Sequence, residues 1–293
     1  MNWFIYAFLC AIFLSASSVI EKRILQKVHA MDFSVSISIV HLICSIPFLW
    51  FVDFSNLSGF LLLLMFITAL FSASASFLVI KGTRHLEVST VYPLLALSPG
   101  STALLAFFVL AERLSGIQVI GIVCMVIGSY ILTIYPGRSL FDPFRTFFNS
   151  RYIHLVLLSL LFYSLGAIFD RTILHSFLVA IPAYIFFVHF FSALLFISIS
   201  GVFGVGMRGI REGFKKGGPY LWFAGILTVF SRLFEMNAIL LVNVGLVSAV
   251  KRISSFFTTV IGGEIFHEHN LKRKIIAAFI IVVGTFLVVI EMY

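Results

Sequence analysis

Ten apolar segments of membrane-spanning length occupy most of this chain, and they limit its possible folds more than any other feature. An apolar stretch of about 20 residues crosses a bilayer as one α-helix, because a helix satisfies its own backbone hydrogen bonds where no water is present. Of the 293 residues, 61% are hydrophobic and only 11% are charged, so no soluble domain fits between the segments. The sequence therefore predicts an all-α polytopic membrane protein with ten transmembrane helices. The predicted spans are 3–20, 33–52, 58–80, 88–111, 117–135, 152–174, 177–203, 219–242, 244–266 and 275–290.

The positive charges are distributed unequally between the two sides of the predicted membrane. Fifteen of the 20 Lys and Arg residues lie in the odd-numbered loops, two (Arg113 and Arg171) lie in or at the border of the even-numbered loops, and three lie deeper within spans. Cytoplasmic loops carry an excess of Lys and Arg, so we expect the odd loops in the cytoplasm and both termini on the other side of a plasma (inner) membrane. The net charge of +8 follows from this topology and not from one basic face, so nucleic acid is not an expected partner.

The two halves of the chain resemble each other in sequence. Residues 15–25, SASSVIEKRIL, match residues 164–174, SLGAIFDRTIL, at an offset of 149, which pairs Glu21 with Asp170. Each half holds five spans, and this odd number means that the second half enters the membrane in the opposite sense. Such inverted repeats are typical of alternating-access transporters, whose substrate site lies near the midplane between the halves. The predicted division is a first five-helix repeat over 1–136, a connecting loop over 137–151 and a second five-helix repeat over 152–293.

Residues 86–134, which contain AERLSGIQVIGIVCMVIGSYIL, resemble the terminal part of an EamA-type repeat, and the second half repeats this pattern more loosely. Ten helices in two such repeats are similar to the drug/metabolite transporter superfamily, whose members move amino acids, amines, nucleotide sugars or sugar phosphates. The resemblance implies a transporter and not an enzyme. Members of the superfamily usually have cytoplasmic termini, whereas the loop charges of this chain predict the reverse, and we follow the charges.

Two adjacent cations, Lys251 and Arg252, lie within the predicted span 244–266. A cation near the centre of a membrane helix costs about 2.5 to 3.5 kcal/mol, so such residues usually face a protein interior or a water-filled cavity. Ser248, Arg252 and Ser255 share one face at helical spacing, and adjacent ammonium and guanidinium groups suit phosphate or carboxylate, so we predict an anionic substrate here. The pair is also similar to the Lys–Arg pair with which plastid sugar-phosphate translocators grip phosphate. In the alternative, Lys251 snorkels to the interface and Arg252 pairs with a buried carboxylate.

A second charged pair, Arg232 and Glu235, lies within the eighth span at a spacing of three residues, on one helix face. We predict that Arg232 lines the substrate site and that Glu235 is the best candidate for proton coupling or gating, unless Arg232 holds it ionised. In the alternative, the pair neutralises itself inside the bundle and only fixes the orientation of the helix. Pro93 and Pro99 remove backbone donors from the fourth span and are candidate hinges, although many membrane helices carry proline for packing alone.

The preferred hypothesis is a secondary transporter that moves a small anionic metabolite, bearing phosphate or carboxylate, by alternating access. The alternatives are a lipid-phosphate flippase, an amino-acid or drug exporter of the same fold, and a non-transporting membrane assembly subunit. No nucleotide-binding loop, nucleophile motif or redox pair is present in the sequence, so we expect neither catalysis nor a cofactor. We expect no metal site either, because His267, Glu268 and His269 lack the spacing of a zinc motif. The expected partners are a small-molecule substrate, the bilayer and, for coupling, protons or a counter-substrate, while the oligomeric state is left open.

Overall fold

The computed structural model describes residues 2–52, 57–98, 100–101, 115–133, 149–177, 179–202, 206–242, 247 and 250–290. This part of the chain is built from helices and contains no β-strand. Six of its helices are long and apolar enough to cross a membrane, which confirms the prediction of an all-α polytopic membrane protein. The helices are α1 (Trp3–Leu25), α2 (Ala30–Ser45), the 3₁₀-helix η1 (Ile46–Phe51), α3 (Gly59–His85), α4 (Val88–Leu95), α6 (Gly116–Thr133), α8 (Arg151–Ser176), α9 (Ile181–Val202), α10 (Gly206–Leu241), α12 (Ile253–Ile265) and α13 (Leu271–Ile290).

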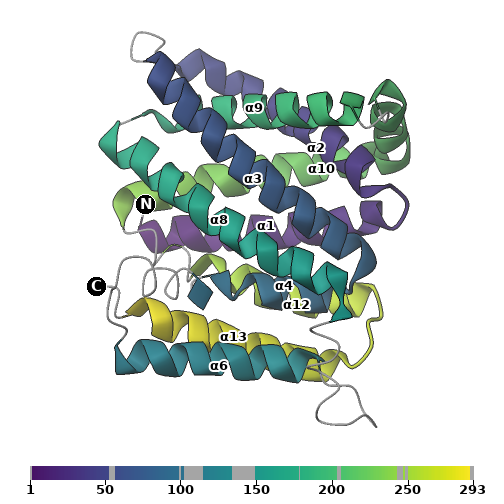
Figure 1. The fold of residues 1–293 in the computed structure, drawn as a ribbon, viewed down its shortest axis with the longest axis vertical. Helices are drawn as coiled ribbons and strands as arrows, with labels where there is room; N and C mark the ends of the chain where they lie inside the picture. Colours follow the sequence, from purple (N-terminus) through teal and green to yellow (C-terminus); the bar gives the residue numbers. More distant parts are fainter. Residues whose placement is uncertain are drawn as a thin grey trace.

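The helices pack in reciprocal pairs between the first and second halves of the chain. α1 of the first half packs along α10 of the second half. Reciprocally, α8 of the second half packs along α3 of the first half. In the same way α2 contacts α10 and α9 contacts α3, while α4 meets α12 and α6 meets α13. Figure 1 shows α6 and α13 side by side at one edge of the bundle, with α4 and α12 between this pair and the remaining helices. The two halves therefore interlock through the whole bundle, and α4 and α12 form the central one of these contacts.

Glycines allow α6 and α13 to pack backbone against backbone. A Cβ atom on Gly121 would lie 2.7 Å from the carbonyl oxygen of Gly284, and one on Gly284 would lie 2.6 Å from the carbonyl oxygen of Gly121. Small residues are usual where membrane helices associate closely, because lipid provides no hydrophobic force that would push the helices together. The edge pair is therefore held by close van der Waals contact that larger side chains would prevent.

The helix α4 is shorter than the span predicted for it. It ends at Leu95, two residues after Pro93, and the amide of Leu97 then donates to the carbonyl oxygen of Leu94 across 3.1 Å. Pro93 lies inside this helix, and because proline cannot donate the helical hydrogen bond, it leaves the carbonyl oxygen of Ser89 without its usual donor and weakens the short helix. The centre of the bundle thus contains an interrupted helix and not a straight one.

A carboxylate from the second half binds the other end of α4. Glu268, in the loop between α12 and α13, accepts hydrogen bonds from the amides of Val88 (2.7 Å) and Ser89 (2.9 Å) and from the hydroxyl group of Ser89. A negative charge at this place satisfies free amide groups of the first helical turn and interacts favourably with the helix dipole. Beside it, Lys274 of α13 pairs with Glu87. These contacts between the two halves therefore close the end of the bundle at which the odd-numbered loops lie, which we call the odd-loop end.

The helix α10 consists of two parts that meet at Gly218. This residue has φ 53° and ψ −140°, a conformation that glycine adopts more readily than any other residue, and Pro219 begins the second part. In the first part, Gly213 lies so close to α2 that a Cβ atom would collide with the side chain of Ser36. The opposite face of this part is basic and exposed, at the right-hand edge of the bundle in Figure 1. Its exposed cations are Arg208, Arg211, Lys215 and Lys216.

Candidate functional site

Four charged side chains form a continuous chain between α8, α10 and the residues that precede α12. Arg232 of α10 donates to Asp170 of α8 across 2.7 Å, and to Glu235, about one turn further along α10, across 3.1 Å. Glu235 also accepts a hydrogen bond from Lys251 across 2.6 Å. The sign of the charge alternates along this chain of charges, so its two carboxylates and two cations balance. The structure thus brings together three of the predicted site residues, Arg232, Glu235 and Lys251.

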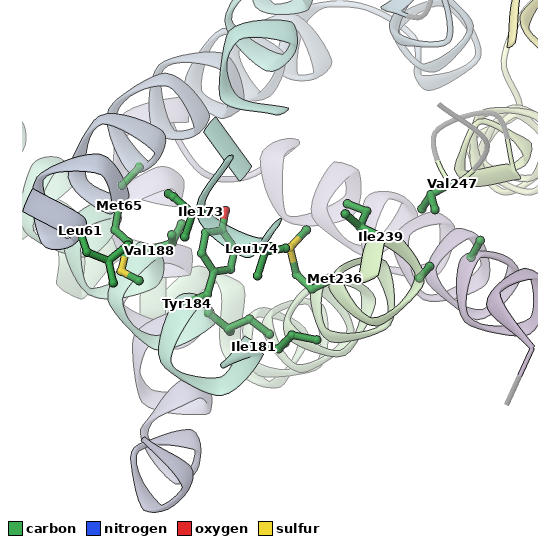
Figure 2. Packing of buried hydrophobic residues seen from close by; sticks show 14 of the residues in the cluster. Leu61, Met65, Ile173, Leu174, Ile181, Tyr184, Val188, Met236, Ile239 and Val247 are labelled. Carbon is green, nitrogen blue, oxygen red and sulfur yellow. The ribbon is translucent and has the colours of Figure 1, made fainter. Parts of the chain in front are cut away.

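Tyr184 of α9 holds the Asp170 end of the chain of charges. Its hydroxyl group donates to Asp170 and accepts a hydrogen bond from the guanidinium group of Arg232, 3.0 Å away. The Tyr184 ring is fully buried, and Figure 2 shows it packed beside Ile173 and Leu174 of α8. The side chain of Asp170 is only 7% exposed, and a buried charge is tolerated only when it has such partners. Both packing and hydrogen bonds therefore fix this end of the chain of charges.

Arg252 is bonded differently from the other cations inside the bundle. It lies at the turn directly before α12, which begins at Ile253, whereas Lys251 belongs to the helical stretch before that turn. The buried Nε of Arg252 has no hydrogen-bond partner, and no carboxylate of the described residues lies within ion-pair distance of its guanidinium group. Glu235, which binds Lys251 instead, and Tyr163 are its electrostatic neighbours. In the described part of the chain, the carboxylate partner therefore belongs to Lys251 and not to Arg252.

Of the remaining predicted residues, the structure describes Ser255 and Pro93. Ser255 is buried in the first turn of α12, and its amide donates to the carbonyl oxygen of Arg252 across 3.0 Å, in a turn tighter than that of an α-helix. Pro93 is buried within α4. Ser248 and Pro99 lie outside the described residues. The predicted polar face over Ser248, Arg252 and Ser255 assumes one continuous helix, whereas the structure has a turn at Arg252.

An apolar hollow of about 480 Å³ lies beside the chain of charges. It is formed by the end of α8, the start of α9 and the end of α10, so it is at the even-loop end of the bundle, opposite the end that Glu268 closes. Leu233 and Asn237 in its wall are close neighbours of Arg232 and Glu235 along α10. The four charged side chains are not among the residues that line the hollow, so it lies next to the chain of charges along α10 without containing it. The lining residues are Leu174, Val179, Ala180, Ile181, Pro182, Leu233, Asn237 and Leu240.

Known proteins with a similar sequence or fold agree with this architecture. Residues 1–134 match the EamA-like transporter family. This first half of the chain is therefore similar to that family, which is part of the drug/metabolite transporter superfamily. The EamA match confirms the predicted resemblance, and the six long apolar helices support a multi-pass membrane protein. No curated protein matches the chain significantly.

A solved structure shares the fold of this chain. It is described only as the crystal structure of a protein, and it aligns with a TM-score of 0.58 and 13% sequence identity. The alignment covers 97% of this chain and 95% of that chain. At this identity the similarity concerns the fold alone.

Two members of the site are not among the residues predicted from the sequence. The sequence could have identified Asp170 as a site residue, because the match between the halves pairs it with Glu21. A carboxyl group inside a membrane span is energetically costly, which also marks a candidate site. Tyr184 carries no such signal, since one tyrosine in a helix rich in aromatic residues is usually a packing residue.

Proposed function

We propose that this protein is a secondary transporter of a small anionic solute, and that Arg252 and Lys251 bind the phosphate or carboxylate group of that solute. The observation that carries the proposal is the state of Arg252, a guanidinium group inside the bundle without a counter-ion among the described residues. The chain of Asp170, Arg232, Glu235 and Lys251 is balanced, so Arg252 adds one uncompensated positive charge. An isolated cation inside a membrane protein is costly, and an anionic ligand supplies the partner that it lacks.

The chemistry of these two cations favours an oxyanion over other ligands. A guanidinium group presents a planar fork of N–H donors that matches two oxygens of a phosphate or carboxylate, while the ammonium group of Lys251 acts as a compact charge. Because Arg252 directly precedes α12, the partial positive charge at the start of that helix adds to the same region. Ser255 in the first turn of α12 is a candidate hydroxyl donor, and Ser248, outside the described residues, is a candidate from its spacing alone.

We assign a gating role to Glu235. It binds both Arg232 and Lys251, so an arriving anion competes with it for Lys251. Release of Lys251 would remove a contact between α10 and the residues that precede α12, and a ligand that stabilises one arrangement over another shifts the population toward it. Pro93 in α4 and Pro99, outside the described residues, are the proposed hinges for this change.

The test removes each cation while keeping the size of the side chain. Purified protein in detergent is screened with phosphates, carboxylates, amino acids and amines, because a ligand of the folded state raises its melting temperature. For the anion with the largest effect, calorimetry should show that Arg252→Gln and Lys251→Met each weaken binding about ten- to a hundredfold, since charge-assisted hydrogen bonds contribute about 1.5 to 3 kcal/mol. Arg252→Lys should lose part of the affinity, because it keeps the charge but not the planar fork.

Arg211→Gln is the matched control for these variants. It also removes one cation from the second half, but from the exposed face of α10, so the affinity should stay unchanged. Unchanged affinity in both site variants, or stabilisation by amines and not by anions, would refute the proposal. Stabilisation by phospholipid but not by small anions would favour the flippase. Flux of the bound anion into liposomes separates a transporter from an assembly subunit.

A further inference from the structure

Glu21 of α1 is a carboxyl group inside the bundle to which no cation is bound. Among the described residues, no Lys, Arg or His lies within ion-pair distance of its oxygens. The adjacent Lys22 points toward the end of α3, where it donates to the carbonyl oxygens of Thr83 and Leu86, each 2.6 Å away. The two carboxylates of the chain of charges, by contrast, are each bound by at least one cation.

Hydroxyl groups surround the Glu21 carboxyl instead of cations. Ser17 Oγ lies 2.8 Å from Glu21 Oε1, 2.7 Å from Thr228 Oγ1 and 3.1 Å from the carbonyl oxygen of Ala224. When Glu21 is ionised, Thr228 can donate to Ser17 and Ser17 can donate to the carboxylate. When Glu21 is protonated, it can donate to Ser17, which then donates to Ala224. The same contacts satisfy both protonation states, as a group that binds and releases a proton requires.

The elements around this end of α1 supply no free positive charge to Glu21. Tyr92 and Tyr163 interact with it electrostatically and are neutral phenols. Arg84 donates to the carbonyl oxygen of Val28 across 2.8 Å. A buried carboxyl group without a cation favours its neutral form, which makes this position suited to hold a proton. The titratable groups on the elements around α1 include Asp32 and His41 of α2, Lys81, Arg84 and His85 of α3, Tyr92 of α4, Tyr163 of α8, Glu212, Lys215, Lys216, Tyr220 and Arg232 of α10, and Glu264 of α12.

The two halves of the chain differ at this point in a way that accounts for the missing cation. The offset of 149 pairs Glu21 with Asp170, and an offset of 159 aligns FSA in the third span with FSR in the eighth, which pairs Ala73 with Arg232. The second half thus neutralises its carboxylate with an arginine, and the first half has an alanine at the corresponding position. Of the two matched carboxyl groups, Glu21 and Asp170, Glu21 is therefore the one that is left without a cation and able to bind a proton.

We propose that Glu21 is the proton-binding site that couples anion transport to proton movement, an inference that rests on the proposed function. In the coupling step, the carboxylate takes up one proton to form a carboxylic acid and later releases it, so only one O–H bond forms and breaks. The change reaches the anion site through α10, because Thr228 lies one helical turn before Arg232. A change in the contact between Ser17 and Thr228 therefore acts on the turn that carries the pair with Asp170.

The first test detects the proton itself and needs no substrate. Infrared spectra of the purified protein over a pH series should contain the carbonyl band of a protonated carboxyl group that disappears at high pH. Glu21→Gln should lack this band, whereas Glu212→Gln, which removes an exposed carboxylate paired with Lys216, should keep it. A band that persists in Glu21→Gln, or the absence of such a band from the wild type, would overturn the proposal.

The second test measures coupling in liposomes with inorganic phosphate as the probe anion. If one proton moves with each anion, a gradient of one pH unit drives about a tenfold accumulation in the wild type. Glu21→Gln should show none, yet it should still exchange phosphate when no gradient is present. Equal accumulation by both proteins would overturn the coupling. Failure of the anion proposal looks different, because exchange would be absent or insensitive to Arg252→Gln while the infrared band remains.

Discussion

At the residue scale, the contribution of the site to folding stability depends on which charged side chains keep their ion-pair partners. Arg232 and Asp170 are 2.7 Å apart, and the side chain of Asp170 is almost fully buried, so the carboxylate has lost most of its hydration. A buried pair of this kind adds little stability compared with apolar residues of the same size, but removal of one member leaves the other buried and alone. The cost of a substitution here is therefore set by the group that remains.

Arg232→Gln should destabilise the protein by about 3 to 5 kcal/mol, because it leaves Asp170 without a cation and Glu235 with Lys251 alone. Adding Asp170→Asn should restore part of this stability, since the unpaired charge is then gone. Thermal unfolding in detergent of the two single variants and the double variant measures the effect. A double variant whose loss equals the sum of the two single losses would mean that the groups act independently.

Local spacing predicts some contacts of these charges but does not choose between partners. Arg232 and Glu235 are three residues apart on one helix, a relation that the sequence contains, and the structure places them 3.1 Å apart. Lys251 and Arg252 are neighbours in the sequence, yet only Lys251 contacts Glu235 in the described residues. That difference depends on the turn at Arg252 and on the approach of α10, and the contact with Asp170 depends on the packing of α8. These long-range relations leave no periodic pattern in the sequence.

At the scale of elements, two of the irregular helix positions coincide with glycine and proline and one does not. The end of α4 follows Pro93, and the bend of α10 falls at Gly218. Both could be predicted, because these residues have known effects on the helical backbone. The turn at Arg252 contains neither residue type, and its backbone stays in the helical region at φ −67° and ψ −15°, so the span is locally tightened there. Tertiary contacts with α10 accompany this turn, and the sequence of the span does not contain them.

Gly218→Ala should destabilise the protein by about 1 to 3 kcal/mol, measured as a lower melting temperature in detergent. The added Cβ atom has no neighbour within 4 Å, so the loss would come from the positive φ of 53° and not from a clash. Gly116→Ala is the control, because it also places a Cβ atom in open space but has no positive φ. Equal melting temperatures for the two variants would mean that the bend in α10 carries no backbone strain.

At the scale of the whole molecule, the positive charges gather at one end of the bundle, where the odd-numbered loops lie. This end also contains the contacts of Glu268 with Val88 and Ser89, while the hollow beside the chain of charges lies at the other end. The asymmetry of charge was visible in the sequence, because it requires only the order of the spans. The contacts between Glu268 and α4 at this end could not be predicted from the sequence, since the two lie far apart along the chain.

A reporter protein fused after Tyr293 should lie outside the cytoplasm, because fifteen cations in odd loops against two in even loops favour that orientation. Alkaline phosphatase, which is active only outside the cytoplasm, should be active in this fusion, and a green fluorescent protein at the same place should stay dark. A fusion after Ser150, in an odd loop, should give the opposite pair of results. A fluorescent fusion after Tyr293 would restore the orientation that is usual in the superfamily.

The exposed basic face on the first part of α10 gives the protein a preference among lipids. Each Lys or Arg near a membrane surface contributes about 1 kcal/mol of attraction to anionic headgroups, and this face carries four, of which Lys216 is paired with Glu212. Vesicles whose outer leaflet is richer in anionic lipid should therefore collect molecules with this helix on the outside, and high salt should weaken the bias. A reconstituted population would then be sorted by direction, so the uptake and release of a solute by the same vesicles would differ in rate even for a symmetric transport cycle.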